Sequence, residues 1–517
     1  MSKNTILKGT LILTIAGFAT RFIGVFYKIY LAKIMGAEMM GVYQLVFPVY
    51  GICFTLYGSG LQTSISRLIA AERGKNSGRN IKKILAVGLL FSVSIALILS
   101  FLVYNNSNFI ASRLLTEPRS ASSLRVLAFV FPFCGITACI NGYYYGIKNA
   151  SVPAASQLLE QIVRVLTVYI ISSILGGGNV MLTCELAVFG IVLGEIASNI
   201  YNIVSFTKSN LKNTSKRETL SNRLPFFQSV HEAKIPNNLL KLTIPLTSNR
   251  LLISILQSFE AVLIPNMLKS SGLTNAEALS VYGILIGMSM PFIMFPSTIT
   301  NSFAVMLLPA VSEAQASSNK RLINTTTSIS IKYSLLIGIL STGIFIIFGE
   351  SLGMIVFHNK LAGSFLVTLA WLCPFMYLTT TLGSIINGLG KAHITFFNTV
   401  VGISIRILFI LFMVPTKGIA GYLIGLLISQ LAISFLDVIA IYRNVPVTFH
   451  AINWIVKPSI IILFVGIFVM RFYTYLTKTI STNSLMLLFL CCFILCVIYF
   501  ILLVITKAIS LKEFKLK

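Results

Sequence analysis

The sequence predicts an all-α polytopic membrane protein with about 14 transmembrane helices. Of its 517 residues, 56% are hydrophobic and 10% are charged, and the mean hydropathy is +0.88. A soluble protein keeps roughly a quarter of its residues charged, so this composition excludes a soluble fold. Apolar runs of about twenty residues recur along the whole chain, each long enough to cross a hydrocarbon core of roughly 30 Å. The short alternating segments of a transmembrane β-barrel are not the dominant pattern.

The first span is expected to be retained rather than cleaved. Its apolar run follows Lys8 and continues past Arg21 to about Met35, with no clear small-residue cleavage site. The predicted spans, in chain order, are 6–34, 42–71, 84–104, 122–146, 153–175, 181–207, 238–266, 278–310, 323–348, 363–389, 394–414, 418–442, 451–474 and 484–506.

Positive charge gathers in the connections that follow even-numbered spans. Examples are Arg73 and Lys83 after the second span, Lys148 after the fourth and Lys391 after the tenth. By the positive-inside rule, both termini are expected in the cytoplasm of a multi-pass cell-membrane protein. The net charge of +26 is explained by such loops facing anionic lipid, so no nucleic acid is expected as a partner.

Two sequence matches point to an internal duplication with an offset of about 240 residues. Asn141–Leu166 and a weaker copy from Asn387 both open with Asn-Gly, and an arginine follows a glycine by eighteen residues in each. These pairs are Gly146 with Arg164, and Gly388 with Arg406. Gly41-Val42-Tyr43 likewise resembles Ser280-Val281-Tyr282. Repeats of this kind are typical of transporters.

The polar segment after the sixth span predicts where the halves divide. We expect an N-terminal lobe at 1–207 with spans 1–6, a cytoplasmic linker at 208–237, a C-terminal lobe at 238–447 with spans 7–12, and two extra spans with a basic tail at 448–517. Because six is even, the two six-helix lobes share one orientation and form a parallel repeat around a central cavity.

Four arginines lie near the middle of predicted spans: Arg21, Arg164, Arg250 and Arg406. Each costs about 2.5–3.5 kcal/mol on insertion scales, so these side chains are expected to face the protein interior or a wet cavity. Gly24 and Lys28 share one helix face with Arg21, which gives that face two cations and little bulk.

Acidic residues within the predicted spans are few: Glu160, Glu185, Glu195, Glu260 and Asp437. Glu160 precedes Arg164 by four residues, the favourable order for an intrahelical pair, so a structural role and a counter-ion role are equally open. Glu260 is a counter-ion or a coupling-ion ligand. The remaining positive charge predicts an anionic ligand, and phosphate is the expected one because arginine holds it in a bidentate geometry.

Cysteines and histidines do not suggest a cofactor. The eight cysteines lie in apolar stretches and the four histidines are scattered, so no metal site is expected. The sequence has no recognisable nucleophile–base arrangement. No catalytic residue and no enzyme activity are therefore predicted.

The fourteen-span plan and two stretches resemble the stage V sporulation protein B family. The stretches are GTLILTIAGFATRFIGVFYKIYLAKIMGAEMMGVYQLVFPVY and GIKNASVPAASQLLEQIVRVL. That family belongs to the multidrug/oligosaccharidyl-lipid/polysaccharide exporter superfamily, alongside the lipid II flippases. The resemblance covers essentially the whole chain and implies two lobes about a central cavity.

The resemblance also implies an activity: flipping an undecaprenyl-pyrophosphate-linked sugar, here lipid II for spore cortex peptidoglycan. The implied partners are this substrate, membrane lipids and enzymes of cell-wall synthesis. The first-helix arginine pattern of lipid II flippases matches here at Arg21 and Gly24, whereas its second arginine position is Tyr27, with Lys28 adjacent. Phe295-Pro296-Ser297 is present, but Pro291 stands where a further arginine is expected, and Arg250 is a candidate to compensate.

Three alternatives stay open at this point. Instead of a lipid II flippase, the chain could be a flippase for another cell-surface polysaccharide, a cation-coupled drug exporter of the same superfamily, or a non-transporting membrane scaffold for cell-wall synthesis. The exporter is disfavoured by the sparse acids. A membrane-embedded glycosyltransferase lacks the carboxylates that its chemistry requires.

Overall fold

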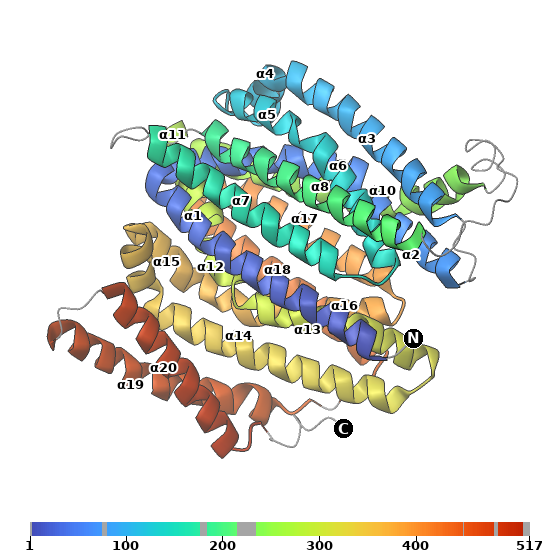
Figure 1. Ribbon diagram of the computed structural model, residues 1–517. Helices are drawn as coiled ribbons and strands as arrows, with labels where there is room; N and C mark the ends of the chain where they lie inside the picture. Colours follow the sequence, from blue (N-terminus) through green and yellow to red (C-terminus); the bar gives the residue numbers. More distant parts are fainter. Residues whose placement is uncertain are drawn as a thin grey trace, which may run out of the picture. The chain divides into compact units, whose positions relative to one another are not determined.

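A computed structural model describes residues 3–74, 80–175, 184–214, 234–447, 449–479 and 484–509. The regular structure of these residues is helical (Figure 1), which confirms the predicted all-α class. Twelve helices in them are long and apolar enough to cross a membrane, and a pair bent by 44°, Ser120–Ala128 with Val130–Gly146, makes a thirteenth. The chain is therefore a multi-pass membrane protein.

The first candidate span is too long to be a single crossing. Thr14–Arg73 has 60 residues, about 90 Å of helix at 1.5 Å per residue. Gly36 breaks it, with φ 74° and ψ 175° inside α1 (Lys3–Phe54). A break at this point divides the segment into two crossings of a roughly 30 Å core, as predicted for spans 1 and 2.

By packing, the helices group into two compact units. Unit 1 comprises Met1–Tyr27 and Ile34–Asn266, and unit 2 comprises Lys28–Lys33 and Met267–Lys517. This grouping differs from the expected division at 207/238, because α10 (Ile235–Ser270) packs with unit 1. Of the predicted linker 208–237, α8 reaches Thr214 and α10 begins at Ile235, and 215–233 lie outside the described residues. The predicted lobe boundaries were drawn from the internal repeat, whereas these units are defined by packing, so the lobe boundaries stay a prediction.

Unit 1 is built on a core between three helices and the start of α10. Its remaining helices are α2 (Gly60–Gly74), α3 (Ile81–Asn105), α4 (Ser107–Phe109), α5 (Ser120–Ala128), α6 (Val130–Gly146), α7 (Ser151–Leu175) and α8 (Cys184–Thr214). A π-helical turn, η1 (Thr55–Ser59), joins α1 to α2. Leu61 and Ile65 of α2 pack with Leu85 of α3 and Tyr144 of α6.

Unit 2 follows the same plan and adds two helices. Its elements are α11 (Asn275–Tyr282), η3 (Gly283–Ser289), α12 (Met290–Met294), α13 (Ser297–Ala316), α14 (Lys320–Phe357), α15 (Lys360–Leu369), η4 (Ala370–Leu372), α16 (Cys373–Gly388), α17 (Ala392–Lys417), α18 (Ile419–Tyr442), η5 (Ile452–Val456), α19 (Lys457–Thr479) and α20 (Ser484–Ile505). Figure 1 shows α19 and α20 beside α14, where Tyr499 donates a hydrogen bond to the Leu336 carbonyl oxygen.

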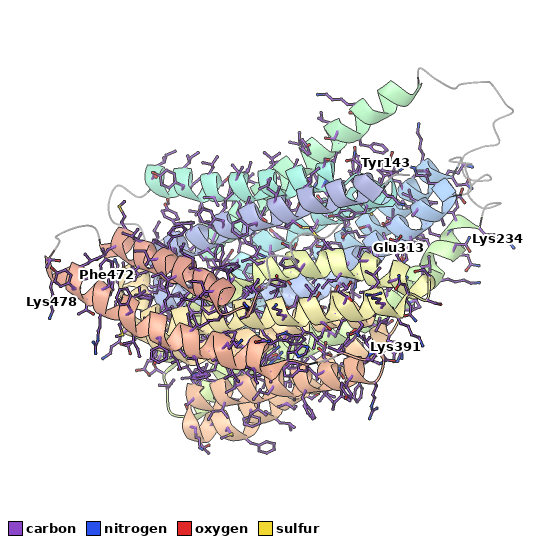
Figure 2. All side chains as sticks on the ribbon, turned by 90° about the horizontal axis from the view of Figure 1, so that it is seen from below. Tyr143, Lys234, Glu313, Lys391, Phe472 and Lys478 are labelled. Atoms are coloured by element: carbon purple, nitrogen blue, oxygen red, sulfur yellow. The ribbon has the colours of Figure 1, made fainter. Side chains whose placement is uncertain are left out.

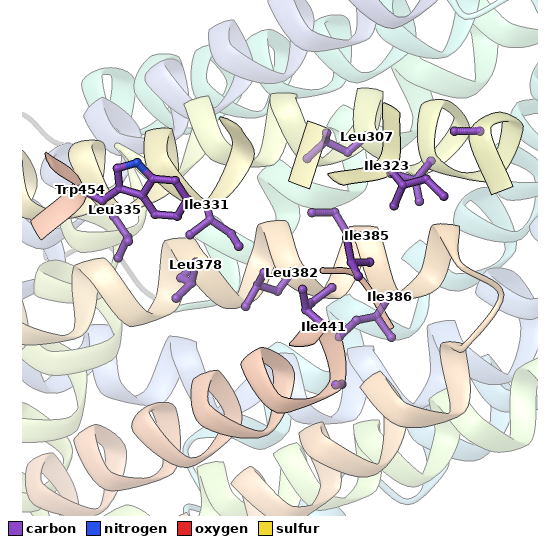
Figure 3. Packing of buried hydrophobic residues seen from close by; sticks show 14 residues of the cluster. Leu307, Ile323, Ile331, Leu335, Leu378, Leu382, Ile385, Ile386, Ile441 and Trp454 are labelled. Atoms are coloured by element: carbon purple, nitrogen blue, oxygen red, sulfur yellow. The ribbon is translucent and has the colours of Figure 1, made fainter. Parts of the chain in front are cut away.

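The core of unit 2 lies between α13, α14, α16 and α18. Leu307, Ile331, Leu382 and Ile441 from these four helices pack together (Figure 3). Figure 2 shows that Lys391 and Lys478 lie at opposite ends of this unit. Their placement agrees with connections that alternate between the two sides of the membrane.

The duplication is visible in matched helix contacts, at an offset of 242 residues. A Cβ built on Gly146 of α6 would lie 2.8 Å from Ile69 Cβ and 2.9 Å from the Ser66 carbonyl oxygen of α2. A Cβ built on Gly388 of α16 would lie 2.9 Å from Val311 Cβ and 3.0 Å from the Leu308 carbonyl oxygen of α13. All three positions are shifted by the same 242 residues, so each unit has the same close helix crossing.

Two turns repeat at the same offset. Thr116 and His358 have φ of 55° and 50°, and Lys148 and Gly390 have φ of 61° and 79°. Such left-handed backbone is uncommon outside glycine, so its recurrence at matching positions is a specific sign of a shared fold. The internal repeat predicted from Arg164 and Arg406 thus has an offset of 242 residues. The predicted parallel orientation of the two lobes stays a prediction.

Candidate functional site

The first candidate site is centred on Arg250 in α10. This helix packs closely on the break between α1 and α2: a Cβ on Gly60 would lie 2.0 Å from Thr247 Oγ1. Ser254 Oγ lies 2.9 Å from Thr55 Oγ1 in the same π-helical turn. Arg250 is exposed, and its Nη1 donates a hydrogen bond to the Ser59 carbonyl oxygen at the end of that turn.

A second cation acts electrostatically on Arg250. Arg67 of α2 is also exposed, and its charge acts on Arg250. The Arg250 guanidinium therefore hydrogen-bonds to a neutral carbonyl oxygen and is repelled by another positive charge. An anion bound nearby would stabilise this arrangement. Sequence reasoning missed Arg67, although its place seven residues after Gly60, two turns along α2, could have indicated it.

The predicted first-helix residues lie on α1. Arg21 is exposed and Lys28 is half-buried. A Cβ on Gly24 would lie 3.6 Å from Gln161 Nε2 of α7, so this part of α1 runs close to α7. Arg21 and Gly24 group with unit 1 and Lys28 with unit 2. The shared role predicted for them stays a prediction.

The predicted pair between Glu160 and Arg164 is confirmed. The two side chains form an ion pair one turn apart on α7, and they are 21% and 20% exposed. This pair supplies Arg164 with one carboxylate. Glu260, the other proposed counter-ion, is buried on α10 in unit 1.

A second carboxylate, Glu195 of α8, lies close to this pair and is 6% exposed. Cys134 of α6 donates to its Oε1 at 3.0 Å, and Thr137 donates to its Oε2 at 3.2 Å. The charges of Glu160 and Arg164 both act on it. Two carboxylates and one guanidinium thus share the interior of unit 1.

Asn199, one turn beyond Glu195, continues the network. Its Nδ2 donates to Thr137 Oγ1 at 3.0 Å and to the Phe133 carbonyl oxygen at 2.9 Å. The sequence alone names Glu195 only as an acid in a span. The spacing of Glu195, Asn199 and Asn202 along one face of α8 is the signal that could have identified a polar stripe.

Unit 2 has a simpler version of this network. Asp437 of α18, 242 residues after Glu195, is 3% exposed and accepts a hydrogen bond of 2.7 Å from Asn398 of α17. Arg406, which matches Arg164, is half-buried, and Gly402 stands in the place of Glu160. The matched pair of buried acids was not foreseen from the sequence.

The fold defines a polytopic helical membrane protein, and several charged side chains lie within its candidate spans. A family model described as polysaccharide biosynthesis protein matches residues 6–315, more than half of the chain. The chain belongs to this polysaccharide biosynthesis protein family.

Individual relatives agree with this assignment. Stage V sporulation protein B of Bacillus subtilis is 26% identical over 466 residues, covering 90% of this chain and 88% of the relative. The structure of the lipid II flippase MurJ in an inward closed conformation has a TM-score of 0.66 at 15% identity, covering 95% of this chain and 98% of that one. An inward-facing MATE family transporter of the MOP superfamily has a TM-score of 0.63 at 15% identity, covering 86% and 98%. These two structures share the fold of this chain.

Proposed function

We propose that the protein is a flippase for lipid-linked sugar pyrophosphates, and that its substrate is the undecaprenyl-pyrophosphate precursor of spore cortex peptidoglycan, lipid II. The similarity to stage V sporulation protein B and to the lipid II flippase fold supports the class of substrate. The observation that carries the proposal is the pair of exposed cations Arg67 and Arg250 within membrane helices of unit 1.

The chemistry of the substrate fits these groups. A pyrophosphate is an anion with several acceptor oxygens, which guanidinium groups bind with charge-assisted hydrogen bonds. Placed near Arg67 and Arg250, it would relieve the repulsion between them. Arg21 and Lys28 of α1, and Arg164 and Arg406 of α7 and α17, are proposed to lower the cost of moving the headgroup through the membrane interior.

The direction of transport follows from charge. With the outside positive, the membrane potential favours outward movement of an anion by about 2.3 kcal/mol per charge per 100 mV. The polyprenyl tail remains in lipid, so only the headgroup needs a polar path. No covalent step is required of the protein.

The test is an assay of lipid II exposure on the outer leaflet, in reconstituted vesicles or in cells, with and without the protein. Wild-type protein is expected to expose lipid II. Arg250→Gln and Arg21→Ala are expected to abolish exposure while membrane insertion stays normal, because each removes a cation that faces the anion.

Lys417→Gln is the matched control, since Lys417 is an exposed cation at the end of α17 rather than within a span. It is expected to retain wild-type activity. Full activity of a normally inserted Arg250→Gln variant would contradict the proposal. A protein that supports cell-wall synthesis with all these cations neutralised would instead behave as a scaffold.

A further inference from the structure

The interface between α6 and α8 in unit 1, here called the polar seam, contains buried polar atoms without protein partners. In the described part of the chain, such atoms on these two helices are Asn199 Oδ1 and both Nδ2 and Oδ1 of Asn202 on α8, and Asn141 Oδ1 and Tyr144 Oη on α6. Tyr144 also packs in the core with α2 and α3. Asn199 and Asn202 are 3% and 0% exposed. Each such atom costs about 1–3 kcal/mol if it stays dry, so several in one interface indicate bound water or a ligand.

The helices α6 and α8 contact each other at more than one level. Thr137 of α6 meets Asn199 of α8, and further along the Tyr143 ring packs against Phe206 at 5.2 Å. Contacts therefore advance in the same direction on both helices. Asn141 and Tyr144 lie one and two turns beyond Thr137, which places them near the level of Asn202.

One end of the polar seam is a carboxylate and the other is a helix terminus. Glu195 begins the row, bonded to Cys134 and Thr137. The row then runs towards Gly146, where α6 ends before Lys148. The charge pattern predicts that this end faces the cytoplasm.

The surroundings of Glu195 favour a proton over a metal ion as its ligand. A carboxylate removed from water must be paired with a cation or bind a proton. The Arg164 guanidinium, whose charge reaches Glu195, already forms an ion pair with Glu160. Among the described residues, the other groups beside Glu195 are the Thr137 hydroxyl, the Cys134 thiol and the Tyr50 hydroxyl, which lies 3.4 Å from Cys134 Sγ. These neutral groups offer no second positive charge.

From this geometry we infer that Glu195 is a proton-binding site, and that the polar seam holds a file of water molecules which carries protons between Glu195 and the Lys148 end of α6. Binding converts the Glu195 carboxylate to a carboxylic acid, and the proton comes from a hydronium ion of the bulk solution at the end of the seam, which leaves a water molecule. The charge of unit 1 thereby changes by one. The link between this change and substrate movement rests on the proposed flippase function, whereas proton binding itself does not.

The first experiment measures protonation directly. Infrared difference spectra of the full-length protein in liposomes are recorded across a pH titration, in the carboxylic acid region. Wild-type protein is expected to show a buried carboxylic acid band that titrates, and Glu195→Gln is expected to lose it. Gln keeps the size and the acceptor oxygen of the side chain, so the fold is retained. Asp437→Asn is the matched control and is expected to keep the titrating band.

The second experiment tests the path. Asn199→Ile introduces the residue that stands at the matching position in unit 2, Ile441, and Asn202→Leu removes an amide that makes no protein hydrogen bond. Both are expected to slow deuterium exchange of the Glu195 carboxyl group while the band itself persists. A carboxylic acid titration that Glu195→Gln leaves unchanged, or unchanged exchange in both seam variants, would overturn the inference.

A third experiment, the lipid II exposure assay at different pH values, tests this inference separately from the proposed function. Outer-leaflet exposure of lipid II by wild-type protein is expected to change with the pH on the Lys148 side, and exposure by Glu195→Gln is expected to lose that dependence. If wild-type protein moves no lipid II at any pH, the flippase proposal fails, and the infrared titration still decides whether Glu195 binds a proton. Wild-type transport that ignores pH would remove the coupling role.

Discussion

The interface between α6 and α8 in unit 1 and its duplicate between α16 and α18 in unit 2 share one backbone plan and differ in chemistry. Tyr144 and Asn199 of unit 1 correspond, 242 residues later, to Ile386 and Ile441. Those isoleucines belong to the apolar core of unit 2 (Figure 3). In unit 1, by contrast, Tyr144 Oη and Asn199 Oδ1 are buried polar atoms without protein partners.

The polar residues of unit 1 and the apolar residues of unit 2 at matching positions show which features of the interface the fold requires and which serve a function. Ile386 and Ile441 demonstrate that an apolar interface satisfies the packing at these positions. A polar interface in unit 1 is thus more than the fold requires, because buried polar atoms without partners are destabilising. Both units nevertheless keep a buried acid at the same position, Glu195 and Asp437.

The largest effect on stability is expected at the ion pair of unit 1. Arg164→Gln leaves Glu160 and Glu195 close together without their guanidinium, so the free energy of unfolding should fall by about 3–5 kcal/mol. In unit 2, Asn398→Ala removes one hydrogen bond to Asp437 and should cost about 1.5–3 kcal/mol. Unfolding in detergent micelles measures both. Equal losses in the free energy of unfolding would show that Glu195 and Asp437 are in equivalent electrostatic surroundings. Adding Glu160→Gln to Arg164→Gln is expected to restore stability.

The next effect tests the duplication itself. Gly146→Ala and Gly388→Ala each place a methyl group within 3.0 Å of a facing backbone carbonyl oxygen. Such overpacking costs about 1–3 kcal/mol, and the two losses should be similar because the crossings are copies. Gly17→Ala is a suitable control, since no heavy atom lies within 4 Å of the Cβ position there. A large loss in the free energy of unfolding at one helix crossing and none at the other would contradict the duplication.

A smaller effect decides whether the polar seam is wet. In a dry interface, Asn202→Leu would raise the free energy of unfolding by about 1–3 kcal/mol, because it removes an unsatisfied amide. With bound water the gain should stay below about 1 kcal/mol, since water already satisfies the amide. Asn444, the matching residue, accepts a hydrogen bond from Lys391 and donates one to the Ala440 carbonyl oxygen, so Asn444→Leu should be destabilising. A strongly stabilising Asn202→Leu variant would count against bound water.

The smallest effect is expected at the repeated turn that contains Thr116 in unit 1 and His358 in unit 2. In unit 1, Arg119 bridges exposed Glu38 and buried Glu117. Hydrogen bonds that Arg119 donates to Glu117, opposed by partial burial and aided by Glu38, raise the pKa of Arg119, so this guanidinium stays charged throughout the usual pH range. In unit 2, Asn359 instead caps α15 by accepting from the Ala362 amide.

The two turns should therefore respond to different substitutions. Glu38→Gln is expected to change the free energy of unfolding by about 0.2–1 kcal/mol, as for other exposed pairs, and less at high salt. Asn359→Ala removes a helix cap and should cost about 1 kcal/mol regardless of salt. Thermal unfolding at two salt concentrations distinguishes them, and a salt-independent Glu38→Gln effect would contradict an electrostatic role.

Several features follow from the sequence alone. The apolar runs determined the helical membrane class and the approximate spans, because a bilayer leaves few other ways to satisfy the backbone. The contact between Glu160 and Arg164 follows from residues four apart on a helix. The matching glycines at 146 and 388 indicated the repeat before any contact was known.

Only the tertiary structure decided which helices meet. The approach of Arg250 to Ser59 and Arg67 depends on α10 packing in unit 1, which no local pattern specifies. Glu195 meets Cys134 and Thr137 because α6 and α8 lie side by side, so its role was invisible in a list of acids. Periodicity determines which face of a helix is polar, whereas the partner of that face is set by contacts between residues far apart in the chain.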